Sequence, residues 1–190
     1  AKSSATVDTD NTETNPDGTL GAKYVTPTTN VNIHRIVENV QNLDGGEYTF
    51  SVFIKPKDSQ WVQLDATQTG SSQSKDITLK YNVVTGAFNG PVTGTNFKST
   101  PYPNGWYRVS VTSIPTNISG TAAFTFRIGI LSSTGQASFA GTGNESLYVW
   151  GVQVEDGTTV SSYVPTSGAA ATRAADVYTS TPNLTETFEP

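Results

Sequence analysis

The chain has 190 residues and a net charge of −5; 14% of its residues are charged, 35% are hydrophobic and 10% are aromatic, which is not the composition of a disordered chain. The negative charge argues against binding of a nucleic-acid backbone as the main activity, and the absence of cysteine excludes disulfides, thiolate metal sites and a cysteine nucleophile. No apolar run approaches the roughly 18 residues of a membrane-spanning helix, so insertion into a membrane is not expected.

The predicted elements begin after a polar N-terminal arm, residues 1–16, which leads into the turn signal Asn15-Pro16-Asp17-Gly18. Runs of alternating apolar and polar residues follow, as expected for strands with one face in a core. These runs cover residues 47–55, 60–66, 76–84, 106–113, 122–131 and 147–154. The last run is apolar on both faces as far as Gln153, which predicts a central strand that is covered on both sides.

No window of 11 or more residues has a convincing helical period; the best candidate, His34–Val40, is too short and contains Val and Asn. Strands separated by turns rich in Gly, Pro and Asn predict an all-β protein, an antiparallel two-sheet β-sandwich of the jelly-roll type. We expect the sandwich to occupy residues 1–165. Residues 166–190, small at first and then rich in Thr and Pro, are expected to form an extended C-terminal segment or linker.

Six segments together resemble a known family. They are DGTLGAKYV (17–25), HRI (34–36), EYTFSVFIK (47–55), NGWYRVSVT (104–112), YVWGVQVEDG (148–157) and SYVPTSGAAATRAADV (162–177). They resemble the jelly-roll, carbohydrate-binding-module-like domain of bacteriophage virion proteins, especially tail fibres and tail spikes. The most specific part is the pattern W-G-x-Q-x-E followed by S-Y-x-P-T and T-R-A-A-D.

The sequence departs from this family at two places. Family members usually carry a leading aromatic strand before the position of Ala1, so either the domain is cut from a longer polypeptide or another chain or element covers that sheet edge. Related sugar-binding jelly rolls often place a calcium-ligating Asp in the last strand, where this chain has Trp150. The resemblance therefore does not support a structural calcium, and no cofactor is expected. Asp8, Asp10 and Glu13 form a small acidic cluster that either binds calcium or belongs to a solvated arm.

The residues themselves suggest a sugar site, because sugars bind to flat aromatic faces flanked by planar polar side chains. Alternation places the predicted ligands on outer strand faces, except for Tyr102, which is expected to line a loop cleft. If their strands are neighbours in one sheet, they form a single glycan platform. The predicted carbohydrate-binding residues are Trp61, Gln63, Asp65, Tyr102, Trp106, Arg108 and Arg127. In the alternative interpretation, Trp61 and Trp106 cover the sandwich edge or pack under loops.

No catalytic residue is predicted. His34 is the only imidazole base, and no G-x-S-x-G motif accompanies it, so a structural histidine is expected. The acidic residues fall mostly in turn-like stretches, and their spacing does not single out a carboxylate pair for glycoside hydrolysis. The chain is therefore expected not to be an enzyme.

The resemblance implies a non-enzymatic module on the virion surface, on a tail fibre, a spike or the capsid, where it binds a host or environmental polysaccharide. Fibre-type proteins of this kind are commonly homotrimers, so other virion subunits are expected partners. A first alternative is a structural decoration or assembly module that binds no sugar and buries its aromatic residues in a protein interface. A second is an accessory carbohydrate-binding module of a polysaccharide-degrading enzyme.

Overall fold

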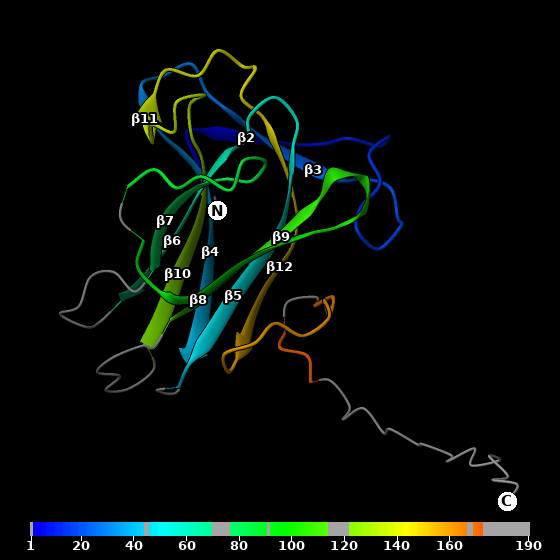
Figure 1. Cartoon of the computed structure of the whole chain (residues 1–190), viewed down its shortest axis with the longest axis vertical. Helices are drawn as coiled ribbons and strands as arrows, with labels where there is room; N and C mark the ends of the chain where they lie inside the picture. The colour runs from blue at the N-terminus through cyan, green and yellow to red at the C-terminus, as the bar shows by residue number, and fades with distance from the viewer. Residues whose placement is uncertain are drawn as a thin grey trace, which may run out of the picture.

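The computed structural model describes residues 2–43, 46–69, 77–90, 92–113, 122–166 and 169–172, which form two antiparallel sheets packed face to face (Figure 1). Sheet A contains, in spatial order, β1 (Lys2–Ser3), β4 (Asn32–Leu43), β10 (Ala122–Ile130), β6 (Trp61–Thr69) and β7 (Ile77–Asn82), with β11 (Ser138–Phe139) also paired to β4. Sheet B contains β2 (Ala5–Thr9), β3 (Lys23–Pro27), β12 (Leu147–Asp156), β5 (Tyr48–Pro56), β9 (Tyr107–Ser113) and β8 (Thr95–Pro101). The predicted all-β two-sheet sandwich is confirmed.

The core lies between the two sheets and is built from the strand faces that alternation assigns to it. Phe50 of β5 stacks on Phe126 of β10 across the sandwich, with ring centroids 4.6 Å apart. Val62 and Leu64 of β6 and Val109 of β9 are fully buried, as the sequence predicts. Burial of a side chain of this kind contributes about 1.5–3 kcal/mol, so these strand faces hold the sheets together.

The longest strand, β4, includes the segment that is the best helical candidate in the sequence. His34 and Ile36 point towards the core, whereas Arg35 and Val37 lie on the opposite face. This is a period of two, but a histidine at an inner position and a valine at an outer one hide it in the sequence. The strand is fixed by its pairing with β10, in which Ile36 lies opposite Ile128.

The prediction of a polar N-terminal arm is wrong for residues 2–9, which form β1 and β2. Ala5 is buried and Val7 packs against the core, while Val7 pairs with Val25 of β3. An edge strand needs few apolar residues, because one neighbour supplies its hydrogen bonds and its outer face stays in water. Residues 2–9 thereby contribute a strand to each sheet, and β1 and β11 together cover part of the edge of β4.

His34 is completely buried, as expected for a structural histidine. Its Nδ1 lies 2.5 Å from the carbonyl oxygen of Ser4, and its Nε2 lies 2.8 Å from that of Phe139. The ring therefore ties the β1–β2 turn and β11 to β4.

Gly94, just before β8, provides a test of how closely the chain packs against the core side chains of the neighbouring strand β9. Its φ is +97°, and a Cβ added there would lie 2.7 Å from Cγ2 of Val111. We expect Gly94→Ala to lower the free energy of unfolding by about 2–4 kcal/mol, because left-handed strain and overpacking add. The matched control is Gly18→Ala, at φ +85° with no atom within 4 Å, which should cost about 1 kcal/mol. Equal losses in urea unfolding would contradict the packing argument.

Candidate functional site

The predicted carbohydrate-binding residues do not form one platform. Trp61, Gln63 and Asp65 lie on β6 and Arg127 lies on β10, both in sheet A. Arg108 lies on β9 of sheet B, Trp106 immediately precedes that strand, and Tyr102 lies between β8 and β9. The condition for a single platform, that these strands are neighbours in one sheet, is therefore not met, and the residues divide between the two outer faces of the sandwich.

Trp106 is fully buried, so its predicted exposure is wrong. The loop between β2 and β3, residues 10–22, folds over this part of sheet B, and the indole Nε1 of Trp106 donates a hydrogen bond of 2.9 Å to the carbonyl oxygen of Thr14. Trp106 packs in a second apolar cluster with Ala22, Phe53 and Tyr148. A loop that contributes few apolar residues thus covers a large aromatic surface, and its backbone accepts the hydrogen bond of the covered indole.

The acidic cluster of this loop is bound to protein groups. Asp10 accepts hydrogen bonds from the hydroxyl groups of Tyr148 and Thr12, at 2.6 and 2.7 Å, and Glu13 pairs with Lys55 at 2.7 Å. These bonds hold the pKa of Asp10 well below its ordinary value of 3.8, and burial together with the neighbouring carboxylate raises the pKa of Tyr148. Among the described residues, no group of three or more metal-ligating side chains is present. The cluster fastens the loop to the sheet.

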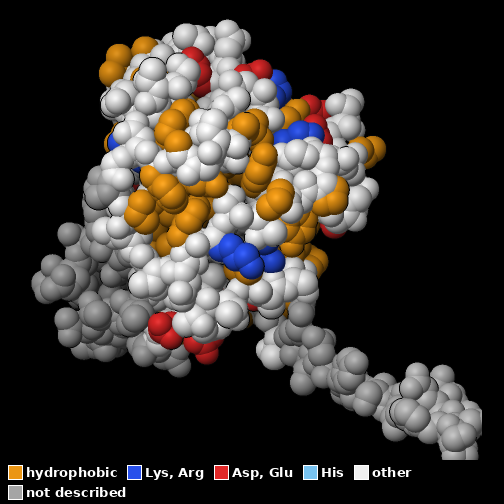
Figure 2. Space-filling model, in the orientation of Figure 1, with side chains coloured by type: hydrophobic (Ala, Val, Ile, Leu, Met, Phe, Trp, Pro, Cys, Tyr) orange, Lys and Arg blue, Asp and Glu red, His pale blue; other side chains and the backbone are white. Residues whose placement is uncertain are grey.

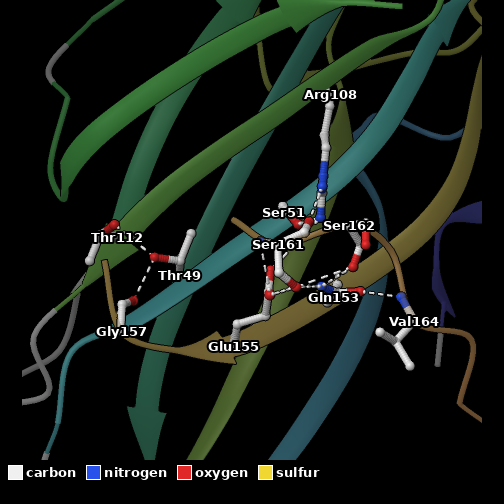
Figure 3. A network of polar contacts seen from close by, with 10 residues as sticks. All are labelled: Thr49, Ser51, Arg108, Thr112, Gln153, Glu155, Gly157, Ser161, Ser162 and Val164. Carbon is white, nitrogen blue, oxygen red and sulfur yellow. Dashed lines mark hydrogen bonds and ion pairs between the residues drawn. The ribbon is translucent and has the colours of Figure 1, made fainter. Parts of the chain in front are cut away.

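A second segment, residues 158–164, covers another part of the outer face of sheet B, and we call it the strap. A β-bulge between Trp150 and Gln153 of β12 shifts the alternation, so that Trp150, Gln153 and Glu155 all face outwards. The strap lies on the side chains of Gln153 and Glu155 (Figure 3). Tyr163 packs on Trp150 with ring centroids 4.4 Å apart, and the backbone amide of Val164 donates to Oε1 of Gln153 at 2.9 Å.

Arg108 lies beneath the strap and is only 5% exposed, so its predicted exposure is also wrong. Its guanidinium donates to the carbonyl oxygen of Ser161 at 2.5 Å and to the hydroxyl of Ser51 at 3.0 Å (Figure 3). Glu155 lies 3.8 Å from the guanidinium and accepts a hydrogen bond from the backbone amide of Ser161. A buried arginine needs such partners, since leaving a buried charge unpaired is strongly destabilising.

Tyr102 is 36% exposed, as predicted for a residue that lines a loop cleft. It lies edge-on to Phe53 and borders a groove of about 280 Å³ between the strap and strands β8 and β9. Apart from this groove, the aromatic side chains on the outer face of sheet B are packed against each other or against the covering segments.

On sheet A the polar residues pair with each other. Arg127 lies directly opposite Asp65 in the β10–β6 register and binds it at 3.0 Å. Arg127 also donates to the hydroxyl of Thr67 at 2.9 Å, and Nε2 of Gln63 donates to Asp65 at 3.0 Å. This arrangement stabilises the two strands as a cross-strand pair. Much of the hydrogen-bonding capacity that was predicted for a sugar is therefore used within the sheet.

Trp61 is different from the other two tryptophans. It is half-buried at the start of β6, and in the described part of the chain no aromatic ring packs on its indole and no acceptor binds its N–H. It borders a cleft of about 240 Å³ at one end of the sandwich, which we call the end cleft. The cleft is also lined by Asp58, Gln60, Asn82, Ser133 and Glu145.

The sequence does not indicate these other lining residues, because they lie at the ends of different strands or in the loops between them. Asp58 and Gln60 precede β6, Asn82 ends β7, Ser133 follows β10, and Glu145 precedes β12. Their spacing carries no common signal. Only their position beside strand ends could have pointed to them, since loops at one end of a sandwich meet there.

No family model and no curated protein matches the sequence. Solved structures with a similar arrangement include the enzymatically active domain of tailspike protein 4 of bacteriophage CBA120, at a TM-score of 0.42, 12% identity and 79% coverage of this chain. They also include the CBM22-1 and GH10 modules of Clostridium thermocellum xylanase 10B complexed with xylohexaose, at a TM-score of 0.40, 15% identity and 81% coverage of this chain. Carbohydrate-binding modules of the β-sandwich superfamily are similar at a TM-score of 0.41, 11% identity and 82% coverage of this chain.

This chain spans 17%, 25% and 56% of the lengths of those three structures. The similarities concern the fold alone. In the described residues, no helix is long and apolar enough to cross a membrane.

The contrast between two tryptophans can be tested by stability. We expect Trp106→Ala to lower the free energy of unfolding by about 3–5 kcal/mol, because it removes a buried ring and leaves a cavity. Trp61→Ala should cost about 1 kcal/mol or less, as is usual for a partly exposed side chain without a buried partner. Urea unfolding at pH 7 gives both values, and a larger loss for Trp61→Ala would place that ring in the core.

The attachment of the loop that covers Trp106 should make the free energy of unfolding depend on pH in the acidic range. The pKa of Asp10 is depressed in the folded protein, so its contribution is present above the ordinary carboxyl pKa of 3.8 and is lost as the pH falls below that value. We expect wild type to lose stability more steeply than Asp10→Asn between about pH 5 and pH 2. Tyr148→Phe removes the main hydrogen bond to Asp10 and should likewise make the loss of stability with falling pH less steep. A slope that is unchanged from wild type in both variants would show that Asp10 does not cause the acid dependence.

Proposed function

We propose that this domain is a non-enzymatic glycan-binding module whose binding site is Trp61 together with the end cleft. The observation that carries the proposal is the state of Trp61: its indole is partly exposed beside a polar cleft, without a ring partner among the described residues. The other two tryptophans are engaged, Trp106 under the loop of residues 10–22 and Trp150 under Tyr163.

The chemistry of the end cleft supports this function. An exposed indole offers a flat apolar face to the C–H face of a pyranose ring, and side chains at its border supply hydrogen bonds to the hydroxyl groups. The volume of about 240 Å³ is below the roughly 300–1,000 Å³ of pockets for drug-sized ligands. It suits a single sugar unit and therefore a weak interaction.

The virion setting is part of the proposal and is supported by the sequence resemblance. A module that binds one sugar unit weakly gains from display in several copies, where avidity multiplies affinity by about 10²–10⁴. Tail fibres, spikes and capsids provide such display, and a homotrimer is the form that the resemblance implies. The absence of catalysis is likewise proposed; it is supported by the burial of His34, both of whose ring nitrogens face backbone carbonyl oxygens.

A second candidate, an assembly module, is favoured by one specific surface. The rings of Tyr81, Phe88 and Phe97 lie 5.0–5.2 Å from one another where the chain passes from β7 to β8. Phe88 and Val92 are 44% and 42% exposed. Figure 2 shows hydrophobic side chains gathered on the face that contains this region. Exposed aromatic patches are also typical of protein interfaces.

The proposed function predicts that Trp61→Ala reduces glycan binding at least tenfold while the melting temperature stays nearly constant. The physical reason is that the substitution removes the stacking surface but little of the core. The measurement is retention on polysaccharide gels, together with a glycan array probed with the multimeric protein.

Tyr102→Ala is the matched control, since it removes an exposed aromatic ring from the opposite face of the sandwich and should leave retention unchanged. Wild-type protein that binds no glycan in multivalent form would refute the proposal and favour the assembly module. Equal losses in the two variants would show that the end cleft is not the site.

A further inference from the structure

The end cleft has a marked charge. Its two charged lining residues, Asp58 and Glu145, are both acidic, and no lysine or arginine lines it in the part of the chain that the structure describes. Lys57 binds Oδ2 of Asp58 at 3.1 Å, while its ammonium group also lies 5.2 Å from the ring centroid of Tyr24. This lysine compensates part of one charge without bordering the cleft.

One hydrogen-bond acceptor in the lining of the cleft, the carboxylate of Glu145, is held in place. The two carboxylate oxygens of Glu145 accept hydrogen bonds from the hydroxyl and the backbone amide of Thr142, at 2.7 and 2.9 Å. Because each carboxylate oxygen has two lone pairs, both can accept a further hydrogen bond. Glu145 is therefore a fixed acceptor at one border of the cleft.

A hydrogen-bond donor in the lining is the side-chain amide of Asn82, which is only 5% exposed. Its Oδ1 accepts hydrogen bonds from the backbone amides of Val84 and Thr85, at 3.0 and 2.9 Å. This fixes the orientation of the side-chain amide, whose Nδ2 has one long contact of 3.5 Å with Oε1 of Gln60, another lining residue. The lining of the cleft thus combines a fixed amide donor with a fixed carboxylate acceptor.

We propose that the end cleft binds an uncharged sugar unit through a pair of neighbouring hydroxyl groups and discriminates against acidic sugars. This inference rests on the proposed function and names its substrate class. Each sugar hydroxyl can donate to a carboxylate and accept from an amide, and the lining contains both kinds of group. A sugar carboxylate or sulfate would face Asp58 and Glu145 without a lining cation, so like charges would repel it.

The test uses matched ligands that differ only in charge: a β-glucan, a mannan and a galactan, each before and after oxidation of the primary hydroxyl to a carboxylate. Affinity electrophoresis of the multimeric protein measures binding. We expect each neutral polymer that binds to bind at least tenfold more tightly than its oxidised form. Added salt should reduce this ratio, because screening weakens the repulsion.

The double variant Asp58→Asn/Glu145→Gln keeps the shape of the side chains and removes both charges, and it should reduce the ratio to less than threefold. Asp58→Asn alone changes an exposed side chain and should give an intermediate ratio even if the double variant folds poorly. The matched control is Asp8→Asn, an equal change of charge on exposed β2, which should leave the ratio at its wild-type value.

The outcomes separate this inference from the proposed function. If an oxidised polymer binds as tightly as its neutral form, or if only a polymer of cationic amino sugars binds, and binding still depends on Trp61, the substrate class is wrong and the glycan-binding function stands. If no glycan binds the multimeric protein, or if binding does not depend on Trp61, the function or the site itself fails and the inference fails with it.

Discussion

A sandwich of two sheets has two outer faces, and this chain covers one of them with its own loops. On sheet B, the loop of residues 10–22 closes over Trp106, and the strap closes over Arg108 and Trp150. Both segments are fastened by hydrogen bonds to buried or partly buried polar groups, which are costly to leave unpaired. Of the three tryptophans, this coverage leaves Trp61, on the opposite sheet, as the one that neither segment covers.

The strap also shows how a bulge changes the chemistry of a strand. Without the extra residue in β12, Gln153 and Glu155 would face the core, where a carboxylate and an amide would lack water. With the bulge, Val152 and Val154 pack towards the core and the two polar side chains reach the strap. The segment that follows the last strand therefore becomes part of the folded unit, although it contains no regular secondary structure.

The polar residues of sheet A illustrate the competition between pairing and binding. Asp65 and Arg127 have the side-chain types of a sugar site, but their direct cross-strand register makes them partners of each other. At the end cleft, the carboxylate of Glu145 and the amide of Asn82 are bonded to backbone amides and a neighbouring hydroxyl, and both keep capacity for further hydrogen bonds. Functional capacity here depends on which hydrogen bonds the fold has already used.

The fold class and the inner faces of six of the twelve described strands follow from the sequence, because alternation in segments such as 47–55 and 106–113 reflects the geometry of a strand. The sequence pattern missed β1 to β4, β8 and β11. In β4, His34 occupies an inner position where an apolar residue is expected. β1, β2, β8 and β11 lie at sheet edges, where few apolar residues are needed. The pattern placed Trp61 on an outer face but grouped it with Trp106 and Arg108, since alternation tells which side of a strand a residue occupies and not which sheet the strand joins or what covers it. These points require the tertiary structure, because strand order, loop coverage and the meeting of Asp58, Asn82 and Glu145 depend on contacts between segments far apart in the chain.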